Sequence, residues 1–246
     1  MKKSALIFLI LTALFEVALC GLYGNDIYFT KPKTWSEARK YCREHHTDLS
    51  SITTKDENQK LLDKRNTNSK ALPAWIGLYS DANDTWKWSG GKKALFNRSR
   101  LMNPNEEDTC VVQNEEGWWK KDCEDEFNFY CFQSKLVLVK ENKTWEEAME
   151  QCRQQHTDLV SLRSESALIK TLQTCREAQT DHVWIGLRYL AGNWLWVNGD
   201  DMRYYARSQE KAPQCPAKSR HCGALSLEGQ LWDSRDCEEK LNFVCY

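Results

Sequence analysis

The sequence predicts an α+β fold of two helices followed by small mixed sheets and long loops, cross-linked by disulfides and present twice. Three observations lead to this prediction. Helix-start motifs precede segments with strand periodicity, which is the order of an α+β domain. The same motifs recur about 110 residues later in a chain of 246 residues. Finally, 11 cysteines are too many for an ordinary cytosolic protein and indicate disulfides.

The first 20 residues have the three parts of a secretory signal peptide. Basic Lys2 and Lys3 precede an apolar run at residues 5–14, and the segment 18–21 supplies a cleavage site after Cys20. An uncleaved anchor is the alternative, but a membrane span needs roughly 20 apolar residues, and Glu16 interrupts this run. We therefore expect residues 1–20 to be removed, leaving a secreted, extracellular protein with no stable membrane insertion.

The charge and the cysteine count of the mature chain restrict its partners. The formal charge is −1, and removal of Lys2, Lys3 and Glu16 changes it to −1 − (2 − 1) = −2. Such a balance provides no electrostatic attraction to nucleic acid or to an anionic membrane. Cleavage after Cys20 also leaves ten cysteines, an even number that suits disulfide bonding.

The chain contains an internal repeat of one unit. Four sequence landmarks match at separations of 109 to 114 residues: 33–38 with 143–148, 46–49 with 156–159, 75–78 with 184–187, and 128–131 with 242–245. A period of this length is a whole domain rather than a short solenoid repeat. We expect domains at residues 22–132 and 136–246, held close together because the linker between them is short.

Helices are predicted at the start of each unit. Two capping boxes mark the first helix, and their members are Thr34 with Glu37, and Thr144 with Glu147. A second helix is expected after Thr54 in the first copy and after Ser164 in the second. Short apolar or alternating runs then predict strands at 75–78, 86–90, 110–113 and 127–131, and at 184–187, 194–199, 222–226 and 241–245.

Taken together, these landmarks resemble the C-type-lectin-like domain family. Each half has a cysteine in the first helix, a Trp-Ile-Gly-Leu strand, a Trp-x-Trp strand and three cysteines near its end. The resemblance covers residues 23–246. It implies the disulfides Cys42–Cys131, Cys110–Cys123, Cys152–Cys245 and Cys222–Cys237, whereas four cysteines by themselves allow three connectivities.

Two cysteines of the second unit exceed this pattern. They are Cys175, after the second helix, and Cys215, in a long loop. Because every other mature cysteine has an implied partner, we expect these two to pair with each other. Pairing between two chains is the alternative.

Calcium is not expected as a cofactor. The resemblance implies that sugar-binding members hold this ion with an acid-Pro-amide triplet, a further Glu and a Trp-Asn-Asp triplet, because Ca²⁺ needs 6–8 oxygen ligands. The first unit has Asn103-Pro104-Asn105 and then Trp118-Trp119-Lys120-Lys121-Asp122 in these places. The second unit has no such triplet at residues 213–218, and its late motif is Trp232-Asp233-Ser234.

The leading functional prediction is a secreted recognition protein that binds a glycan or an extracellular protein through the loops 96–108 and 202–220. The candidate ligand-binding residues are Asn103, Asn105, Glu107, Trp119, Lys120, Trp232 and Asp233. The alternative is a calcium-dependent lectin in which Asn103, Asn105, Glu107 and Asp122 form a rearranged site. No enzyme is expected, because the sequence contains neither a free mature thiol beside a base nor a phosphate loop or nucleophile elbow.

Three sequons are candidate glycosylation sites in a secreted chain. They are Asn83-Asp84-Thr85, Asn97-Arg98-Ser99 and Asn142-Lys143-Thr144. Occupied sequons would lie in exposed turns. The sequence does not indicate the oligomeric state.

Overall fold

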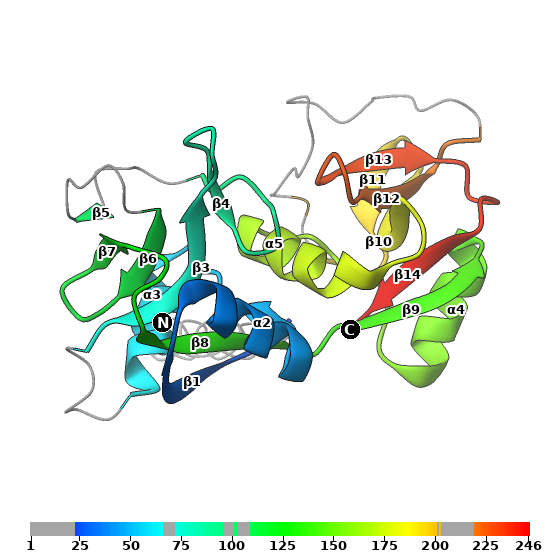
Figure 1. Cartoon of the computed structure of the whole chain (residues 1–246). Helices are drawn as coiled ribbons and strands as arrows, with labels where there is room; N and C mark the ends of the chain where they lie inside the picture. Colours follow the sequence, from blue (N-terminus) through cyan, green and yellow to red (C-terminus); the bar gives the residue numbers. More distant parts are fainter. Residues whose placement is uncertain (1–22, 66–71, 96–100, 103–108, 201, 203–218) are drawn as a thin grey trace, which may run out of the picture.

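Two similar α+β halves lie side by side in the computed structural model of the chain (Figure 1). The structure describes all residues except 1–22, 66–71, 96–100, 103–108, 201 and 203–218. The predicted signal peptide therefore lies outside the described residues. A short connection, Ser134 to Leu136, joins the last strand of the first half to the first strand of the second.

The first half contains helices α2 (Trp35–His45) and α3 (Lys55–Asp63) and a mixed sheet. The strands of this sheet follow the order β1 (Gly24–Lys33), β8 (Phe127–Ser134), β3 (Ala74–Ser80), β6 (Cys110–Gln113), β7 (Trp118–Lys121) and β5 (Leu101–Met102). Two short strands lie off this path: β2 (Asp48–Leu49) pairs with β8, and β4 (Trp86–Trp88) pairs with β3. Strands β3 and β8 run parallel, whereas β1 and β8 are antiparallel.

The second half repeats this arrangement. Its helices are α4 (Trp145–Gln155), α5 (Glu165–Thr174) and the 3₁₀ turn η3 (Cys175–Glu177). The sheet has the order β13 (Leu231–Arg235), β12 (Cys222–Ser226), β10 (His182–Leu190), β14 (Leu241–Cys245) and β9 (Val137–Lys143), with β11 (Asn193–Trp196) paired to β10. Strands β10 and β14 run parallel, like β3 and β8 of the first half.

Both predicted capping boxes are confirmed. The Thr34 hydroxyl accepts a hydrogen bond from the Glu37 backbone N–H, and the Glu37 carboxylate accepts one from the Thr34 N–H. Thr144 and Glu147 form the same pair of bonds at the start of α4. Each box satisfies two backbone donors that the first helical turn leaves unpaired, so the helix start is fixed locally.

Buried tryptophans join the first helix to the core strand in both halves. The Trp35 indole donates to the Ile76 carbonyl oxygen at 3.0 Å, and Trp145 donates to Ile185 in the same way at 2.9 Å. Both indoles are nearly inaccessible to solvent. Each therefore buries a large apolar surface while its N–H keeps a partner, which stabilises the same helix–sheet contact twice.

Four disulfides cross-link the described residues: Cys42–Cys131, Cys110–Cys123, Cys152–Cys245 and Cys222–Cys237. These are the four pairs that the resemblance implies. The long pair in each half ties the first helix to the last strand, and the short pair closes a hairpin of 13 or 15 residues. On the chain-entropy model a loop of about 15 residues contributes roughly 3 kcal/mol to stability.

The prediction of a Cys175–Cys215 disulfide requires a correction at Cys175. This residue carries a free thiol and is completely buried, while Cys215 lies outside the described residues. Cys175 directly follows α5, and its side chain joins the apolar core of the second half together with Leu168 and Leu172. Burial raises the pKa of the thiol, so Cys175 behaves as a small hydrophobic residue rather than as a cross-link or a nucleophile.

Helix α5 holds the two halves together, as its position between the sheets in Figure 1 indicates. Ile169 is fully buried and packs into the core of the first half. The Lys170 ammonium is 2.7 Å from the Glu57 carboxylate, and both side chains are nearly buried. Gln173 donates to the Leu49 carbonyl oxygen at 2.9 Å. A Cβ atom at Gly90 would lie 2.7 Å from Gln173 Cγ, so the halves approach as closely as glycine allows.

The N-terminal strand contributes a second contact between the halves. Tyr23 precedes β1, but its ring is buried in the core of the second half. Its hydroxyl donates to the Ser161 carbonyl oxygen at 2.6 Å, and its own carbonyl oxygen accepts from the Lys135 N–H at 3.0 Å. The expectation that the short linker keeps the halves close therefore agrees with contacts made on both sides of the linker.

Candidate ligand-binding site

The candidate site residues divide into two groups. Asn103, Asn105 and Glu107 lie outside the described residues, as do the positions of the degenerate loop triplet in the second half. Trp119 and Lys120 lie on β7, and Trp232 and Asp233 occupy the equivalent strand β13. These two strands therefore carry the described part of each candidate site.

The tryptophan pair of β7 is anchored to the body of the first half. Trp118 is buried, donates to Asn58 Oδ1 at 2.8 Å and meets the Trp88 ring edge-on. Trp119 is half-buried, donates to Asn114 Oδ1 at 3.2 Å and packs against the core that contains the Cys110–Cys123 disulfide. Both indoles therefore fix the hairpin, and of the two only the candidate Trp119 keeps part of its surface exposed.

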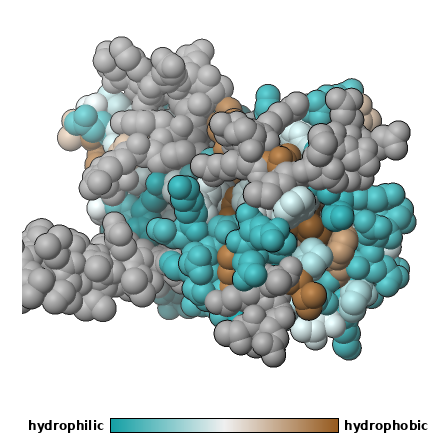
Figure 2. All heavy atoms as spheres, turned by 90° about the vertical axis from the view of Figure 1, so that its left-hand side faces the viewer, coloured by the Kyte–Doolittle hydropathy of each residue, from teal (hydrophilic) through white to brown (hydrophobic). Residues whose placement is uncertain are grey.

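Basic side chains follow the tryptophans on β7. Lys120 and Lys121 pair across the hairpin with Val111 and Cys110, and both are half-buried. The next residue, Asp122, uses its carboxylate to accept the Glu124 N–H at 3.0 Å and so caps the following turn. Figure 2 looks toward this end of the first half, where the described surface is mostly hydrophilic with small separate apolar areas.

The prediction that Trp232 contacts a ligand is wrong. Its side chain is 1% exposed and packs in the core of the second half, with its ring 5.1 Å from that of Trp194. A residue buried to this extent cannot contact a ligand in the folded state. From the sequence alone, Trp232 could be either a core residue or a ligand contact. The packing of Trp194 against its ring shows that it is a core residue.

Asp233 points away from that core because successive side chains of a strand alternate between faces. Its side chain is 53% exposed, and its Oδ2 atom is 3.5 Å from Nε2 of His182 on β10. Of the four described candidates, Asp233 is the one with a largely exposed polar group. Its recorded neighbour is an imidazole rather than a second oxygen donor.

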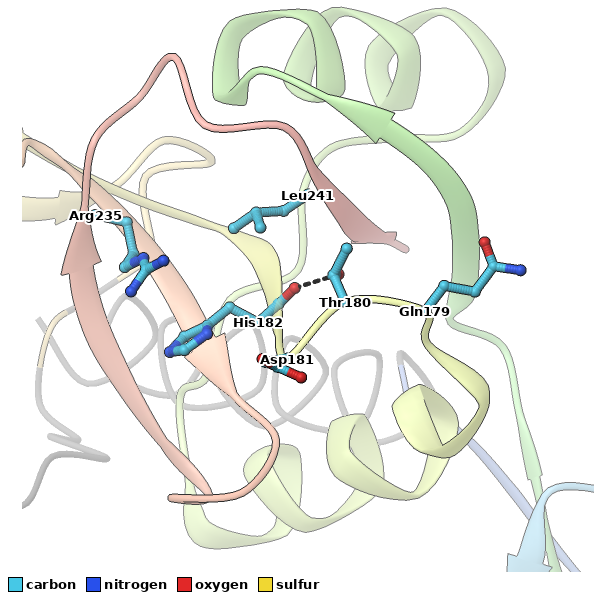
Figure 3. A pocket seen from close by; sticks show the side chains of 6 residues that line it. All are labelled: Gln179, Thr180, Asp181, His182, Arg235 and Leu241. Carbon is cyan, nitrogen blue, oxygen red and sulfur yellow. Dashed lines mark hydrogen bonds between the residues drawn. The ribbon is translucent and has the colours of Figure 1, made fainter.

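An open hollow of about 390 Å³ lies beside this pair (Figure 3). Its lining comprises Gln179, Thr180, Asp181, His182, Arg235 and Leu241. Two of the charged groups at its edge are paired: His182 faces Asp233, and Arg235 makes bonds of 3.0 and 2.6 Å to the Glu239 carboxylate. Asp181 also lines the hollow, which therefore offers polar contacts and a carboxylate. Sequence reasoning missed it because no motif joins residues 179–182 to Arg235 and Leu241.

A calcium ion does not fit the described parts of the two candidate sites. Strand β7 presents Lys120 and Lys121 where oxygen donors would be needed, and a cation beside another cation is repelled. Within the described residues, the one group of three possible metal-binding side chains is Glu146, Cys222 and Cys237. The two cysteines of this group form a disulfide, and Arg188 is 2.6 Å from the Glu146 carboxylate.

Two of the three sequons lie within the described residues. Asn83 is exposed in the turn between β3 and β4, and Asn142 is exposed near the end of β9. The Asn142 Oδ1 atom accepts a hydrogen bond from Asn242 at 2.8 Å. This hydrogen bond involves the amide oxygen of Asn142. It does not involve the amide nitrogen, which is the atom to which a glycan is attached. Asn97 lies outside the described residues.

Comparison with protein families gives the same two units as the fold. The sequence profile of the Lectin C-type domain matches residues 31–133 and again residues 141–246. The chain belongs to the C-type lectin family. The two matches together cover most of the chain, and each contains one helix–sheet unit with its two disulfides.

The C-type lectin relatives include large receptors. The secretory phospholipase A2 receptor of Homo sapiens is 24% identical over 252 residues, covering 86% of this chain and 17% of the receptor. Lymphocyte antigen 75 of Homo sapiens is 24% identical over 254 residues, covering 86% of this chain and 14% of that protein. The chain thus spans less than a fifth of the length of these relatives. Among solved structures, human lithostathine is similar at 25% identity with a TM-score of 0.39, covering 45% of this chain and 88% of that one.

Among the described residues, no helix combines the length and the apolar character that crossing a bilayer requires.

Proposed function

We propose that this tandem C-type lectin protein is secreted and binds an extracellular glycan or protein ligand without calcium. The family and its receptor relatives support a non-enzymatic recognition role. The proposed contact regions are the long loops 96–108 and 202–220, together with Lys120 and Asp233 at the adjoining strands. Loops on a rigid, disulfide-linked scaffold suit recognition, because the scaffold fixes where the loops begin and end.

The composition of β7 is the observation that carries the calcium-independent part of this proposal. Lys120 and Lys121 stand next to Asp122, whose carboxylate already caps a turn. The second half supports the same conclusion, because Asp233 faces His182 and Trp232 is buried. Neither strand therefore supplies the several oxygen ligands that a calcium ion needs.

Extracellular features support the location that we propose. Four disulfides form and persist in an oxidising compartment, and Asn83 and Asn142 are exposed for glycosylation. We propose cleavage after residue 20 and domains at 22–132 and 136–246. Mass spectrometry of the protein secreted by expressing cells measures the mature N-terminus and the occupancy of each sequon together.

Thermal unfolding with and without calcium tests the proposed mode of binding. An ion that binds only the folded state raises the unfolding midpoint by mass action. The purified glycosylated protein is unfolded in millimolar calcium chloride and in excess chelator, with magnesium chloride as the matched control for ionic effects. We expect the same midpoint in all three conditions.

A rise of the midpoint in calcium alone would contradict the proposal and favour the rearranged calcium lectin site. The substitutions Asn103→Ala, Asn105→Ala and Glu107→Gln would then be the first to make, because these side chains supply the oxygen atoms of the alternative site. Loss of the calcium-dependent rise in any one of them would identify that residue as a ligand.

A further inference from the structure

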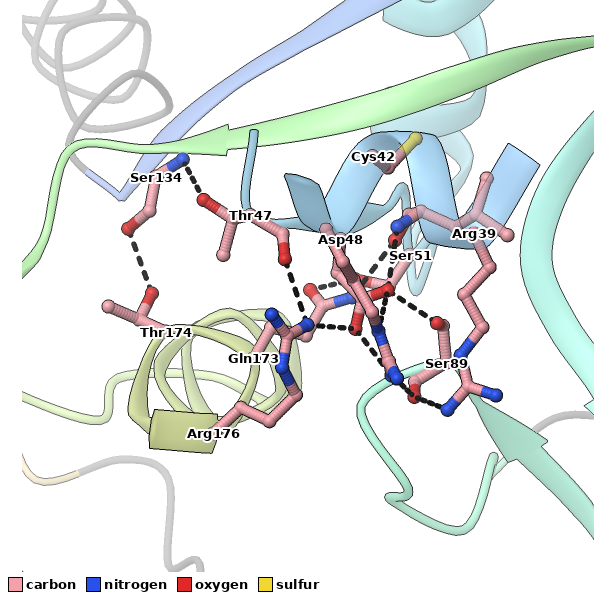
Figure 4. A network of polar contacts seen from close by, with 12 residues as sticks. Arg39, Cys42, Thr47, Asp48, Ser51, Ser89, Ser134, Gln173, Thr174 and Arg176 are labelled. Carbon is pink, nitrogen blue, oxygen red and sulfur yellow. Dashed lines mark hydrogen bonds and ion pairs between the residues drawn. The ribbon is translucent and has the colours of Figure 1, made fainter. Parts of the chain in front are cut away.

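Three arginines lie near a single buried aspartate where the two halves meet, and Figure 4 labels two of them, Arg39 and Arg176, beside Asp48. Arg39 and Arg43 project from α2 of the first half, and Arg176 projects from the turn that follows α5 of the second. The aspartate is Asp48, whose side chain is completely buried. We call these four residues the seam cluster.

The Asp48 carboxylate is contacted at both of its oxygen atoms. Its Oδ1 atom accepts bonds from the Leu49 N–H at 2.9 Å, from the Ser89 hydroxyl at 2.5 Å and from Arg43 Nε at 3.1 Å. Its Oδ2 atom is 3.2 Å from Arg43 Nη2 and 3.7 Å from Arg176 Nη1. The seam cluster therefore has three positive charges and one negative charge, a formal excess of 3 − 1 = 2.

The second half shows which of these arginines the fold itself requires. Its equivalent pair is Arg153 and Asp158, separated by 3.0 Å, and the carboxylate again accepts the next backbone N–H. Arg43 thus has a structural counterpart. The residue 110 positions after Arg39, however, is Met149, so the same helix forms without an arginine at this place. The C-type lectin fold accounts for Arg43 but not for Arg39.

One donor atom of Arg39 has no partner within the described residues. Its Nη2 atom reaches the Ser89 carbonyl oxygen at 3.3 Å, but its Nε atom is buried and has no hydrogen-bond partner. The guanidinium lies over the rings of Trp35 and Tyr79, at 5.4 and 5.9 Å from their centroids. These rings hold its plane in a fixed orientation.

The positive charges of the cluster act on one another. Burial lowers the pKa of Arg39, and the neighbouring Arg43 and, more weakly, Arg176 lower it further. Arg43 and Arg176 keep 26% and 32% of their side-chain surface exposed, so the cluster is reachable from solvent. An anion at the exposed edge of the cluster would relieve this repulsion.

We propose that the seam cluster binds a tetrahedral oxyanion, presented by its ligand as a sulfate or phosphate ester. Guanidinium groups suit such an anion because they form paired, charge-assisted hydrogen bonds, and donors arriving from three side chains match a group with three terminal oxygens. The site needs both halves of the chain, since Arg176 comes from the second. The four residues of the cluster belong to neither of the two long loops, so the proposal does not depend on how those loops bind.

Calorimetric titration of the full secreted chain with sodium sulfate tests the site, with sodium chloride of equal ionic strength as the reference. We expect saturable binding of one sulfate per chain. The substitution Arg39→Met, which copies the residue of the second half, should weaken binding at least tenfold. Lys40→Gln, which removes one charge from the solvent-facing side of the same helix, should leave the affinity unchanged within twofold.

A second variant and a competition experiment complete the test. Arg176→Gln alters the other half of the chain and should also weaken sulfate binding, so the test does not depend on the folding of a single variant. Competition with N-acetylglucosamine 6-sulfate and N-acetylglucosamine 6-phosphate then distinguishes the two esters. No saturable binding by the wild-type chain, equal binding by Arg39→Met, or failure of both esters to displace sulfate would overturn the proposal.

Discussion

Helices α3 and α5 are the same element of the repeated domain, but they lie in different surroundings. Both begin at a hydroxyl N-cap, Thr54 in α3 and Ser164 in α5. In α3 two residues are buried, whereas in α5 seven are buried. The outward positions Gln59, Lys60 and Asp63 of α3 are exposed, and the residues 110 positions later, Ile169, Lys170 and Gln173, are buried.

This difference shows how a duplicated domain acquires an internal interface. The inner face of each helix supports its own core, and the outer face of α5 also contacts the first half through Ile169 and Lys170. Together with Tyr23, these side chains of α5 join the two repeated units. The comparison also supplies matched controls, because the buried residues Ile169, Lys170 and Gln173 have exposed counterparts in α3.

The largest expected effect comes from Lys170→Met. It leaves the Glu57 carboxylate nearly buried without its cation, and breaking a buried pair in this way costs about 3–5 kcal/mol of unfolding free energy. Chemical denaturation measures the loss. The same substitution at the exposed counterpart, Lys60→Met, should change stability by less than about 0.5 kcal/mol.

A double variant separates the charge from the packing. Glu57→Gln together with Lys170→Met removes both charges, so most of the lost stability should return. If the double variant is as unstable as Lys170→Met, the packing of the lysine stem rather than the ion pair holds the halves together.

Ile169→Ala should have the next largest effect. The side chain is fully buried in the core of the first half, and truncating a buried isoleucine costs about 2–5 kcal/mol. Gln59→Ala on α3 is the matched control and should change stability by less than about 0.5 kcal/mol. Equal losses at the two positions would contradict the assigned interface.

Acid should weaken the interface by a smaller amount. Burial raises the pKa of Glu57, but the nearby Lys170 ammonium and hydrogen bonds from Lys170 and Ser166 outweigh burial, and the net pKa is lowered. A lowered carboxyl pKa stabilises the fold above the ordinary value near 4.3, and this contribution disappears as the pH falls through the folded-state pKa. The loss is smaller because a protonated carboxyl still accepts hydrogen bonds.

The matched variant for this effect is Glu57→Gln. Unfolding free energies of the wild-type chain and of Glu57→Gln, measured from pH 7 to pH 3, should converge as the pH falls. Burial raises the pKa of Asp26 and Glu165, which contribute with the opposite sign. The Glu57 charge raises both pKa values further, so these contributions become smaller in Glu57→Gln. Parallel curves would contradict the role of Glu57.

Local signals explain what the sequence predicts correctly about the fold. The capping boxes of α2 and α4 depend on residues three positions apart, so they are visible without any tertiary information. Strands β1 and β9 were not predicted, because their exposure follows no regular alternation and charged residues occur along them. These strands form by pairing with β8 and β14, each about 100 residues away in sequence.

The candidate site was predictable in part. Sequence reasoning named residues on β7 and β13 as candidates without predicting these two strands. It also could not separate a buried Trp232 from an exposed one, because this depends on contact with Trp194. Sequence reasoning also predicted a Cys175–Cys215 disulfide, because every other mature cysteine had an implied partner. In the fold, the Cys175 thiol at the end of α5 lies in the core. The seam cluster was visible as a difference between the copies, Arg39 against Met149, but its meaning requires the position of Arg176 in the fold.

Scanning calorimetry of the intact, disulfide-bonded chain tests most directly whether α5 makes the two halves one body. A single cooperative unit gives one transition whose calorimetric and van't Hoff enthalpies agree. We predict this result for the wild-type chain, and two separate transitions for Lys170→Met and for Ile169→Ala. Two separate transitions in the wild-type chain, unchanged by either substitution, would contradict the account.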